Sequence, residues 1–242
     1  LVDGYLFSSN LWYIRTIIPL SSISLETEKD SLDINIKNKK MIKNFLVVDC
    51  TGKNDSIALK FNNRFFIKKL QTNLFKNEIL TLEIFDFIKK NNIELKNDFS
   101  ILINSGPGSF SGIRVSLAVV KGIQLVKNTN IFSYNSFLLN AAPHLSEKKE
   151  IFSIQKTNNF YYYSRGTFEK NYYFTYPEKI DLNKLPDKEL LVIVPDEIKD
   201  DQLIKNISPK KLRIVEFNLK NIDLLIEHKI VENKLIKPLY LS

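Results

Sequence analysis

Glycine is scarce in this 242-residue chain, yet four of its seven glycines fall between Gly106 and Gly122. Glycines that link a strand to a helix allow positive φ angles and a close backbone approach, and the free N–H groups of a helix start can bind phosphate. This segment therefore predicts a phosphate-binding loop or a tight turn, and Ser109 or Ser111 is expected to cap the following helix. The candidate loop residues are Gly106, Pro107, Gly108, Ser109, Phe110, Gly112 and Arg114.

Neither of the two common nucleotide-binding motifs matches this loop. A P-loop requires Gly-Lys followed by Ser or Thr, whereas Gly112 is followed by Ile113. A dinucleotide fingerprint requires its third glycine one residue earlier and an acid at the end of the next strand, where Ser133 and Tyr134 stand. The residues leave open a purely structural turn, in which Gly112 and Gly122 permit close packing.

Asp49 is the second candidate for chemistry, because it ends a short apolar run typical of a buried strand. A first-strand aspartate holds a metal in ribonuclease-H-like nucleases and in actin-type kinases. Two-metal nucleases need further acids close to it, and Glu78 or Glu83 could supply one. However, Asn104 and Ser105 end the fourth expected strand, where an acid is wanted. The sequence therefore lacks the acidic residue that a two-metal nuclease needs at the end of this strand.

Histidine and cysteine offer little further chemistry. His144 and His228 lie in unrelated segments, and no His-x-x-x-His metal pair is present. The single cysteine, Cys50, excludes an internal disulfide and a cysteine-based zinc site, and it suits a reducing cytoplasm. We therefore expect no catalytic group and no metal site.

The net charge of +8 would suit a polyanionic partner such as RNA. The lysines that cause it are scattered, and the abundance of Lys, Asn, Ile, Phe and Tyr is typical of an A+T-rich genome. RNA binding driven by this charge stays open as an alternative. No apolar run approaches the length of a membrane span, so no membrane association is expected.

The hydrophobic periodicity predicts three strands, a helix, a strand, a helix and a strand, followed by a second, less regular set of elements. The first order is typical of the ribonuclease-H-like fold, which actin-type ATPases duplicate. We therefore expect an α/β protein of two ribonuclease-H-like (actin-like ATPase, ASKHA) lobes with mixed, five-stranded-type sheets. The expected elements are strands 45–49, 56–61, 64–69, 99–104 and 131–134 with helices 74–90 and 111–127, then an aromatic hairpin of 160–163 and 172–175, strands 190–194 and 212–217, and helices within 195–207 and 222–231.

The chain is expected to divide into residues 1–40, a first lobe of 41–136 and a diverged second lobe of 137–242. Residues 1–40 hold the only tryptophan, and Met41, the only methionine, opens directly into a strand. Met41 is therefore expected to be the native start, with residues 1–40 as a leader, an upstream translation or an accessory element. The alternative is an extra strand and helix on the core.

The run from Gly106 to Arg114, Gly-Pro-Gly-Ser-Phe-Ser-Gly-Ile-Arg, resembles the TsaB (YeaZ) family signature Gly-Pro-Gly-Ser-Phe-Thr-Gly-Leu-Arg. Two weaker features agree. Residues 47–51 are similar to the family's opening strand with its Asp-Thr pair, and residues 238–241 resemble its closing Pro-x-Tyr-Leu. Two family marks are missing: the His-Ser or His-Thr pair is replaced around Gln71, and the Asp-Ala-Arg segment by residues 155–157.

This resemblance implies a non-catalytic relative of TsaD/Kae-type enzymes in tRNA threonylcarbamoyladenosine biosynthesis, whose nucleotide cleft between the lobes has been lost. The chain would bind a TsaD-like protein, joined by a TsaE-like ATPase, to modify the adenosine next to the anticodon. ATP and metal would belong to the partner subunits, tRNA would bind mainly through the complex, and the isolated chain could pair with itself. The alternative is an ATP-dependent small-molecule kinase or a nuclease on the same fold.

The resemblance also implies where the partner binds. The two helices of the first lobe would form the contact, often as a four-helix bundle, and the second of them is apolar nearly all round, as a helix with core on one side and a partner on the other should be. Complete burial inside the lobe is the alternative. Asp49 and Thr51 would form a vestigial first-strand site, and the partner-helix candidates are Phe75, Ile79, Leu82, Val115 and Val119.

Overall fold

The structure, a computed structural model, describes residues 42–52, 54–71, 77–95, 99–148, 150–157, 159–168, 171–180, 190–233 and 236–241. Residues 1–41 lie outside the described residues. The expectations for residues 1–40 and for Met41 as the start therefore stay predictions, as do the two borders between the three expected segments.

The first sheet contains the five strands that the periodicity predicts. Their order is β3-β2-β1-β4-β5, with β2 and β3 antiparallel to their neighbours and β1, β4 and β5 parallel. Asn62 and Asn63 both adopt positive φ, as a tight hairpin turn between β2 and β3 requires. The strands are β1 (Asn44–Asp49), β2 (Ser56–Phe61), β3 (Arg64–Lys69), β4 (Phe99–Asn104) and β5 (Asn130–Tyr134).

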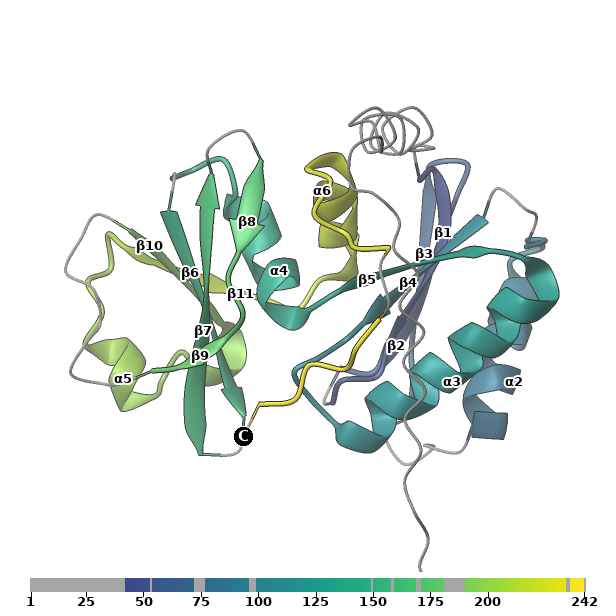
Figure 1. Ribbon diagram of the computed structural model, residues 1–242, viewed down its shortest axis with the longest axis horizontal. Coiled ribbons are helices and arrows are strands. Elements are labelled where there is room, and N and C mark those ends of the chain that lie inside the picture. Colours follow the sequence, from purple (N-terminus) through teal and green to yellow (C-terminus); the bar gives the residue numbers. More distant parts are fainter. Residues whose placement is uncertain are drawn as a thin grey trace, which may run out of the picture. The chain divides into compact units, whose positions relative to one another are not determined.

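Helices α2 (Asn77–Lys90) and α3 (Phe110–Lys127) lie side by side against the first sheet (Figure 1). They bury one face of the sheet, because Leu46 and Val48 of β1 pack with Ile84 of α2 and Val120 of α3 in one apolar core. Ser109 caps α3 by accepting from the N–H of Gly112, and α3 ends at residue 128 in a left-handed conformation.

The second sheet has six strands, two more than the four that the sequence predicts in this half of the chain. Its order is β11-β10-β6-β7-β8, with β9 paired to β7; β6, β10 and β11 are parallel, and β7 is antiparallel to β6, β8 and β9. The predicted aromatic hairpin is present as β7 and β8. The strands are β6 (Glu150–Thr157), β7 (Phe160–Phe168), β8 (Tyr172–Phe174), β9 (Glu178–Lys179), β10 (Leu191–Pro195) and β11 (Leu212–Val215).

The sequence did not predict β6, although β6 lies next to β7 and β10 in the second sheet. Its apolar residues are only Ile151, Phe152 and Ile154, which Ser153 interrupts and polar residues flank, so its periodicity is weak. The helix expected within 195–207 is two short segments, η2 (Asp196–Ile198) and α5 (Gln202–Lys205). The mixed α/β architecture with two sheets is confirmed.

Three short helical segments connect the two sheets. In α4 (Ser136–Ala141), Leu138 and Leu139 pack into the core of the first sheet, whereas Ala141 packs into that of the second. The 3-10 helix η3 (Leu219–Asn221) and α6 (Ile222–Glu227) follow the second sheet in the chain, yet Ile222 and Leu225 pack against Phe45 of β1. Among the described helices, none is long and apolar enough to cross a bilayer.

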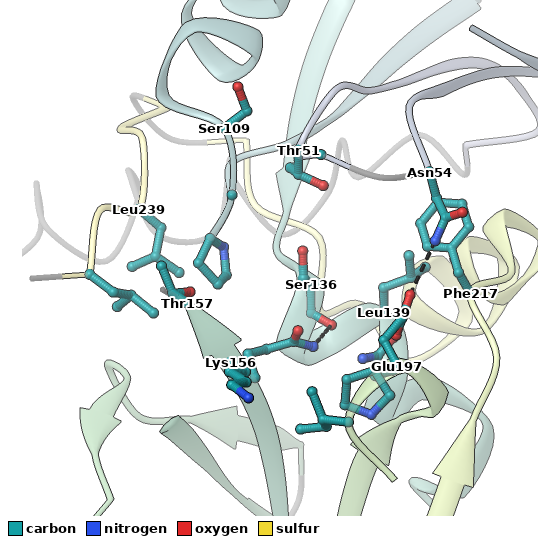
Figure 2. Close-up of a pocket in the computed structure, with 18 of the residues that line it drawn as sticks. Thr51, Asn54, Ser109, Ser136, Leu139, Lys156, Thr157, Glu197, Phe217 and Leu239 are labelled. Atoms are coloured by element: carbon teal, nitrogen blue, oxygen red, sulfur yellow. Dashed lines mark hydrogen bonds between the residues drawn. The ribbon is translucent and has the colours of Figure 1, made fainter. Parts of the chain in front are cut away.

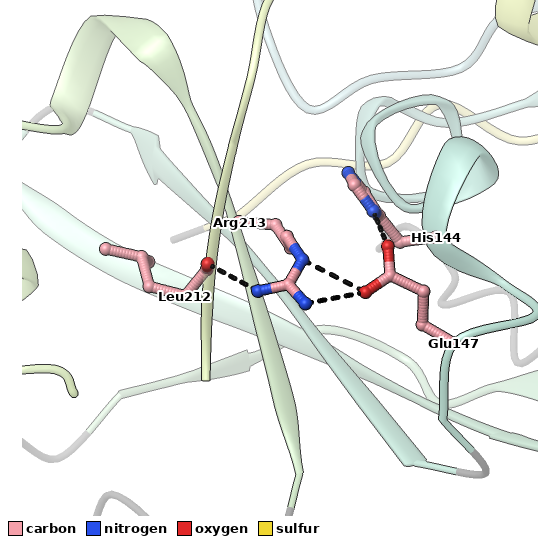
Figure 3. Close-up of polar contacts among 4 residues, drawn as sticks. All are labelled: His144, Glu147, Leu212 and Arg213. Carbon is pink, nitrogen blue, oxygen red and sulfur yellow. Dashed lines mark hydrogen bonds and ion pairs between the residues drawn. The ribbon is translucent and has the colours of Figure 1, made fainter. Parts of the chain in front are cut away.

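A polar cluster ties the turn after the 3-10 helix η1 (Ala142–His144) to the edge strand β11 (Figure 3). Glu147 Oε2 accepts from Arg213 Nε at 3.0 Å and pairs with Nη2 at 2.8 Å, while Oε1 contacts His144 Nδ1. Arg213 Nη1 donates to the carbonyl of Leu212 at 3.0 Å. The hydrogen bond with His144 is the main cause that lowers the pKa of Glu147; burial opposes this shift, and the hydrogen bond from Arg213 adds a weaker lowering effect.

Glu147→Gln is therefore expected to lower the melting temperature at pH 7 by about 1–3 °C, as for other partly exposed ion pairs. A lowered carboxyl pKa stabilises the native state above the unfolded-state pKa, and this stabilisation is lost as the pH falls through the native-state pKa. Wild type and variant should thus converge in acid and in high salt. A difference that persists at pH 3 would contradict this account, and thermal melts at both pH values measure it.

Candidate functional site

The glycine-rich loop lies directly against the end of β1. The N–H of Ser109 donates to the carbonyl of Thr51 at 2.7 Å. A Cβ atom added to Gly108 would lie 2.0 Å from that same carbonyl oxygen, and one added to Gly112 would lie 2.1 Å from the carbonyl oxygen of Cys50. The backbone itself therefore requires glycine at these two positions.

The N–H groups that could form an anion cradle are largely used inside the protein. Gly106 adopts φ +115° and donates to Asn104 Oδ1 at 2.9 Å, and Gly112 donates to Ser109 Oγ at 3.2 Å. With the N–H of Ser109 bound to Thr51, three donors of the loop already have partners. The geometry thus favours the structural turn over the phosphate-binding loop. Gly122 plays no part in it, because a Cβ there would meet nothing within 4 Å.

The segment 236–241 also contacts this loop. Leu239 donates its N–H to the carbonyl of Ser105 at 2.7 Å. The rings of Phe110 and Tyr240 lie 4.8 Å apart, the Arg114 guanidinium lies 3.7 Å from the centre of the Phe110 ring, and its Nε donates to Tyr240 Oη at 3.3 Å. The three segments that resemble the family, far apart in sequence, thus meet at one place.

Asp49 is 1% exposed, and its carboxylate accepts four hydrogen bonds. Oδ1 accepts from Thr51 N at 3.3 Å and from Thr51 Oγ1 at 2.7 Å. Oδ2 accepts from Asn104 Nδ2 at 2.8 Å and from Tyr134 Oη at 2.9 Å. Burial raises the pKa of Asp49, and the hydrogen bonds from Asn104, Thr51 and Tyr134 oppose that shift. The two residues that sequence reasoning noted for lacking an acid, Asn104 and Tyr134, are the donors that hold this carboxylate.

A second buried acid, Asp55, is only partly satisfied. Its Oδ1 accepts from Gly52 N at 2.8 Å, whereas its buried Oδ2 has no hydrogen-bond partner. Burial is the main cause that raises the pKa of Asp55 to about 6. Burial likewise raises the pKa of the Cys50 thiol to about 12, so this cysteine is a poor nucleophile at neutral pH.

A cleft of about 990 Å³ opens beside the loop. Figure 2 shows Thr51 and Ser109 on one side of it and Lys156 and Glu197 on the other. Asn54 Nδ2 donates across the cleft to Glu197 Oε1 at 3.2 Å. A cavity is therefore present at this place, and the loss of nucleotide binding that the resemblance implies stays a prediction. Sequence reasoning also missed most of its lining, which includes Asn54, Ser136, Asn140, Gln155, Lys156, Glu197 and Tyr240.

The five residues expected to contact a partner differ in how far they are exposed. Phe75 lies outside the described residues. Leu82 is 62% exposed, Ile79 and Val115 are half-buried, and Val119 belongs to the core beneath α3. Only Leu82 of this set therefore offers a large free surface.

Further exposed apolar residues extend that surface. Exposed apolar residues recur at helical spacing along α2 and α3. The most exposed are Leu125 and Val126, at 86% and 80%. We call this surface the α2–α3 face, and its apolar members are Leu82, Phe85, Ala118, Leu125 and Val126.

The two histidines serve structural contacts. His144 pairs with Glu147, and the ring of His228 lies edge-on to Tyr172 at 5.4 Å. Within the described ranges, neither histidine is hydrogen-bonded to a serine, threonine or cysteine, and no group of three metal-binding side chains is present.

The strand order of the first sheet and the aspartate at the end of its first strand define a ribonuclease-H-like α/β protein with a second mixed sheet. Two solved structures from Pseudomonas aeruginosa share this fold: an uncharacterized protein with similarity to peptidase YEAZ (TM-score 0.61, 13% identity) and YeaZ (TM-score 0.57, 14% identity). Each match covers 83% of this chain and 100% of that chain.

In sequence, the chain is 33% identical over 135 residues to the tRNA threonylcarbamoyladenosine biosynthesis protein TsaB of Buchnera aphidicola subsp. Baizongia pistaciae (strain Bp). The matched segment is 52% of this chain and spans 60% of that relative's length. No family model matches the chain. The chain is thus similar in sequence to part of this TsaB protein, of which it spans less than two thirds, and it shares its fold with the two Pseudomonas structures.

Two glycines of one helix allow a matched test of the loop geometry. Gly112→Ala is expected to destabilise the protein by about 1–3 kcal/mol or to prevent folding, because its Cβ would overlap the carbonyl of Cys50. Gly122→Ala is expected to stabilise α3 by up to about 1 kcal/mol, because Ala favours the helix and the site is open. Urea denaturation measures both, and equal effects of the two changes would contradict the role of Gly112.

Asp55 allows a test of buried charge. Since its native pKa of about 6 lies above the ordinary 3.8, stability should fall as the pH rises from 3.8 to 6 and stay reduced above that. Asp55→Asn removes the charge and keeps an acceptor for Gly52, so it should stabilise the protein at pH 7.5 by roughly 1–3 kcal/mol. Near pH 4 the two proteins should be equally stable. Urea midpoints at both pH values would refute this if the variant were less stable at pH 7.5.

Proposed function

We propose that this chain is a non-catalytic subunit that binds and activates a TsaD-like enzyme in tRNA threonylcarbamoylation. The modified base is the adenosine next to the anticodon. In this proposal the chain acts in the cytoplasm, and a TsaE-like ATPase joins the assembly. ATP and metal bind to the partner subunits, and tRNA binds mainly through the complex. The name of the Buchnera relative supports the pathway.

The observation that carries the non-catalytic role is the environment of Asp49. A metal-binding aspartate must direct free lone pairs into the cleft. Here Thr51, Asn104 and Tyr134 direct four donor groups at the two carboxylate oxygens. Metal binding at Asp49 would require these hydrogen bonds to be broken in a buried place, where unpaired donors are costly.

Peptidase chemistry, which the description of one structural neighbour mentions, has little support in this chain. A serine or cysteine peptidase needs a nucleophile beside a base. His144 is held by Glu147, and His228 lies against Tyr172. Cys50 is buried, with its pKa raised to about 12.

The α2–α3 face supports the partner role. Large apolar side chains that are exposed together on a globular protein mark a surface that another protein covers. Leu82 and Phe85 of α2 and Leu125 of α3 are each exposed, on two helices that pack side by side. Two such helices can pair with two helices of a partner as a four-helix bundle. The same face gives the isolated chain a surface for pairing with itself.

An ATP-dependent enzyme is the second candidate, and the open cleft is the observation that favours it. Such an enzyme would need a site that binds the phosphates of ATP and their metal ion. Micromolar binding of ATP with magnesium by the isolated chain would favour the enzyme over the subunit.

Leu125→Glu is expected to weaken binding of the TsaD-like protein by about tenfold or more, because it places a charge in an apolar interface. The fold should remain intact, because Leu125 is 86% exposed. Tyr176→Glu is the matched control, since Tyr176 is 70% exposed and lies after β8, away from α2 and α3. Co-purification from cell extract and thermal melts measure the two effects. Unchanged co-purification of Leu125→Glu would refute this interface.

A further inference from the structure

The two edges of the first sheet differ in what lies beside them. The edge of β5 is covered, because Ser133 and Glu232 exchange two backbone hydrogen bonds of 2.7 and 2.9 Å. The other edge is strand β3, which pairs with β2, and no described residue pairs with its outer side. The backbone groups on that side are therefore available to another strand.

The outer side of β3 presents the backbone groups of three residues. In an antiparallel pair, residues that bond to the neighbouring strand alternate with residues that point away from it. Leu70 donates its N–H to the carbonyl of Asp55 at 2.8 Å, so the backbone groups of the even-numbered residues of β3 face β2. The N–H and C=O groups of Phe65, Ile67 and Lys69 therefore point outward.

Strand β3 lacks most of the features that keep an edge strand from pairing. Natural edge strands are protected by short length, bulges, proline or charge. β3 has six residues, contains no proline, and keeps an unbroken register with β2, while Ile67 near its middle is 45% exposed. Only charge remains as protection, and Arg64, Lys68 and Lys69 are all positive.

This charge selects between a second copy of β3 and a different strand. Lys68 is neutralised by Glu83 of α2, whereas Arg64 and Lys69 are exposed and have no acidic partner among the described residues. A second copy of β3 would bring the same two cations into one interface, where like charges repel. A strand with acidic residues would instead meet opposite charge.

The side chains of β3 define the sequence pattern of such a strand. Helices α2 and α3 cover one face of the sheet (Figure 1), and Phe66 packs on that side, whereas Phe65 packs on the side of α6. Ile67 and Lys69 share the side of Phe65, because alternate residues of a strand lie on one face. Opposite residues of neighbouring strands are in contact. Acidic residues are therefore favoured opposite Lys69 and Arg64, and an apolar residue opposite Ile67.

We propose that β3 binds an extended segment of a partner protein by strand addition, with acidic residues at the two ends of that segment and apolar residues between them. The outward groups of Phe65, Ile67 and Lys69 form the main-chain hydrogen bonds, and the side-chain pattern gives the specificity. Ile67 lies on the face of the sheet opposite α2, so this site is separate from the α2–α3 face and goes beyond the proposed function.

NMR titration of the full chain with short capped peptides tests the proposal. The probe is Glu-Thr-Ile-Thr-Val-Glu, and Lys-Thr-Ile-Thr-Val-Lys is its matched control. The acidic peptide should bind with a Kd on the order of 1 mM, about fivefold or more tighter than the basic one, because the control replaces two ion pairs by repulsion. Equal affinity for the two peptides, or no binding of the acidic peptide at about 10 mM, would overturn the proposal.

Hydrogen exchange shows whether the peptide pairs with the backbone of β3. At about 10 mM acidic peptide the amides of Phe65, Ile67 and Lys69 should exchange about tenfold more slowly, because the bound strand accepts from them. The amides of Phe66 and Lys68 already face β2 and should change little. Protection confined to amides outside β3 would contradict strand addition.

Two substitutions at one position separate backbone pairing from a change in the fold. Ile67→Pro removes an outward N–H and should weaken binding of the acidic peptide by about tenfold or more, while proline is tolerated at such an edge position. Ile67→Thr keeps the N–H and should weaken binding by no more than about threefold. Both variants should still co-purify with the TsaD-like protein, which separates this site from the proposed function. Wild-type affinity in Ile67→Pro would overturn the proposal.

A charge reversal tests the same site without touching the backbone. Lys69→Glu should weaken binding of the acidic peptide and strengthen binding of the basic one, because it reverses the charge opposite one end of the strand. Lys127→Glu changes the net charge equally at an exposed position that ends α3, so it is the matched control. Equal effects of the two variants would overturn the proposal. Self-association of the full chain that Ile67→Pro abolishes, measured by sedimentation, would identify a second copy as the occupant and would overturn it as well.

Discussion

The buried carboxylate of Asp49 sets the geometry of the first sheet at its functional end. A carboxylate removed from water must be satisfied by donors, and here they come from the ends of two strands, β4 and β5, and from the turn after β1. Asn104 closes β4, and Tyr134 closes β5. These two strands must therefore end level with β1, and the glycine-rich loop that leaves β4 is brought against the carbonyls of Cys50 and Thr51.

The close approach that follows explains why a glycine-poor chain concentrates glycine in one loop. At Gly108 and Gly112 a side chain is excluded mainly by carbonyl groups of the protein's own backbone. No ligand is needed to explain why these two positions are glycine. A signature that looks like a phosphate loop can thus have a structural cause. The cleft beside it is a separate feature, with a lining of amides, hydroxyls and aromatic rings.

The parts of the fold that follow from local pattern could be predicted from the sequence. The five strands of the first sheet, helix α3 and the cap at Ser109 have strong periodicity or turn chemistry. Strand β6 has a weak apolar pattern and helix α4 is short, and both are buried by neighbouring elements, so tertiary contacts decide them. The site was predictable in part: the loop and Asp49 were found, but Asn104 was noted only for its lack of charge, because its role depends on three strands meeting. Asn140 and Gln155 gave no local signal.

The contact between the segment 236–241 and the glycine-rich loop has a consequence for synthesis on the ribosome. Leu239 and Tyr240 bind a loop that is translated more than a hundred residues earlier, and the entire second sheet is made in between. The glycine-rich loop of the first sheet therefore lacks its contact with residues 236–241 until Leu239 has left the ribosomal exit tunnel. During that delay Phe110 lacks the Tyr240 ring that packs against it in the folded protein, so this apolar surface stays open to water.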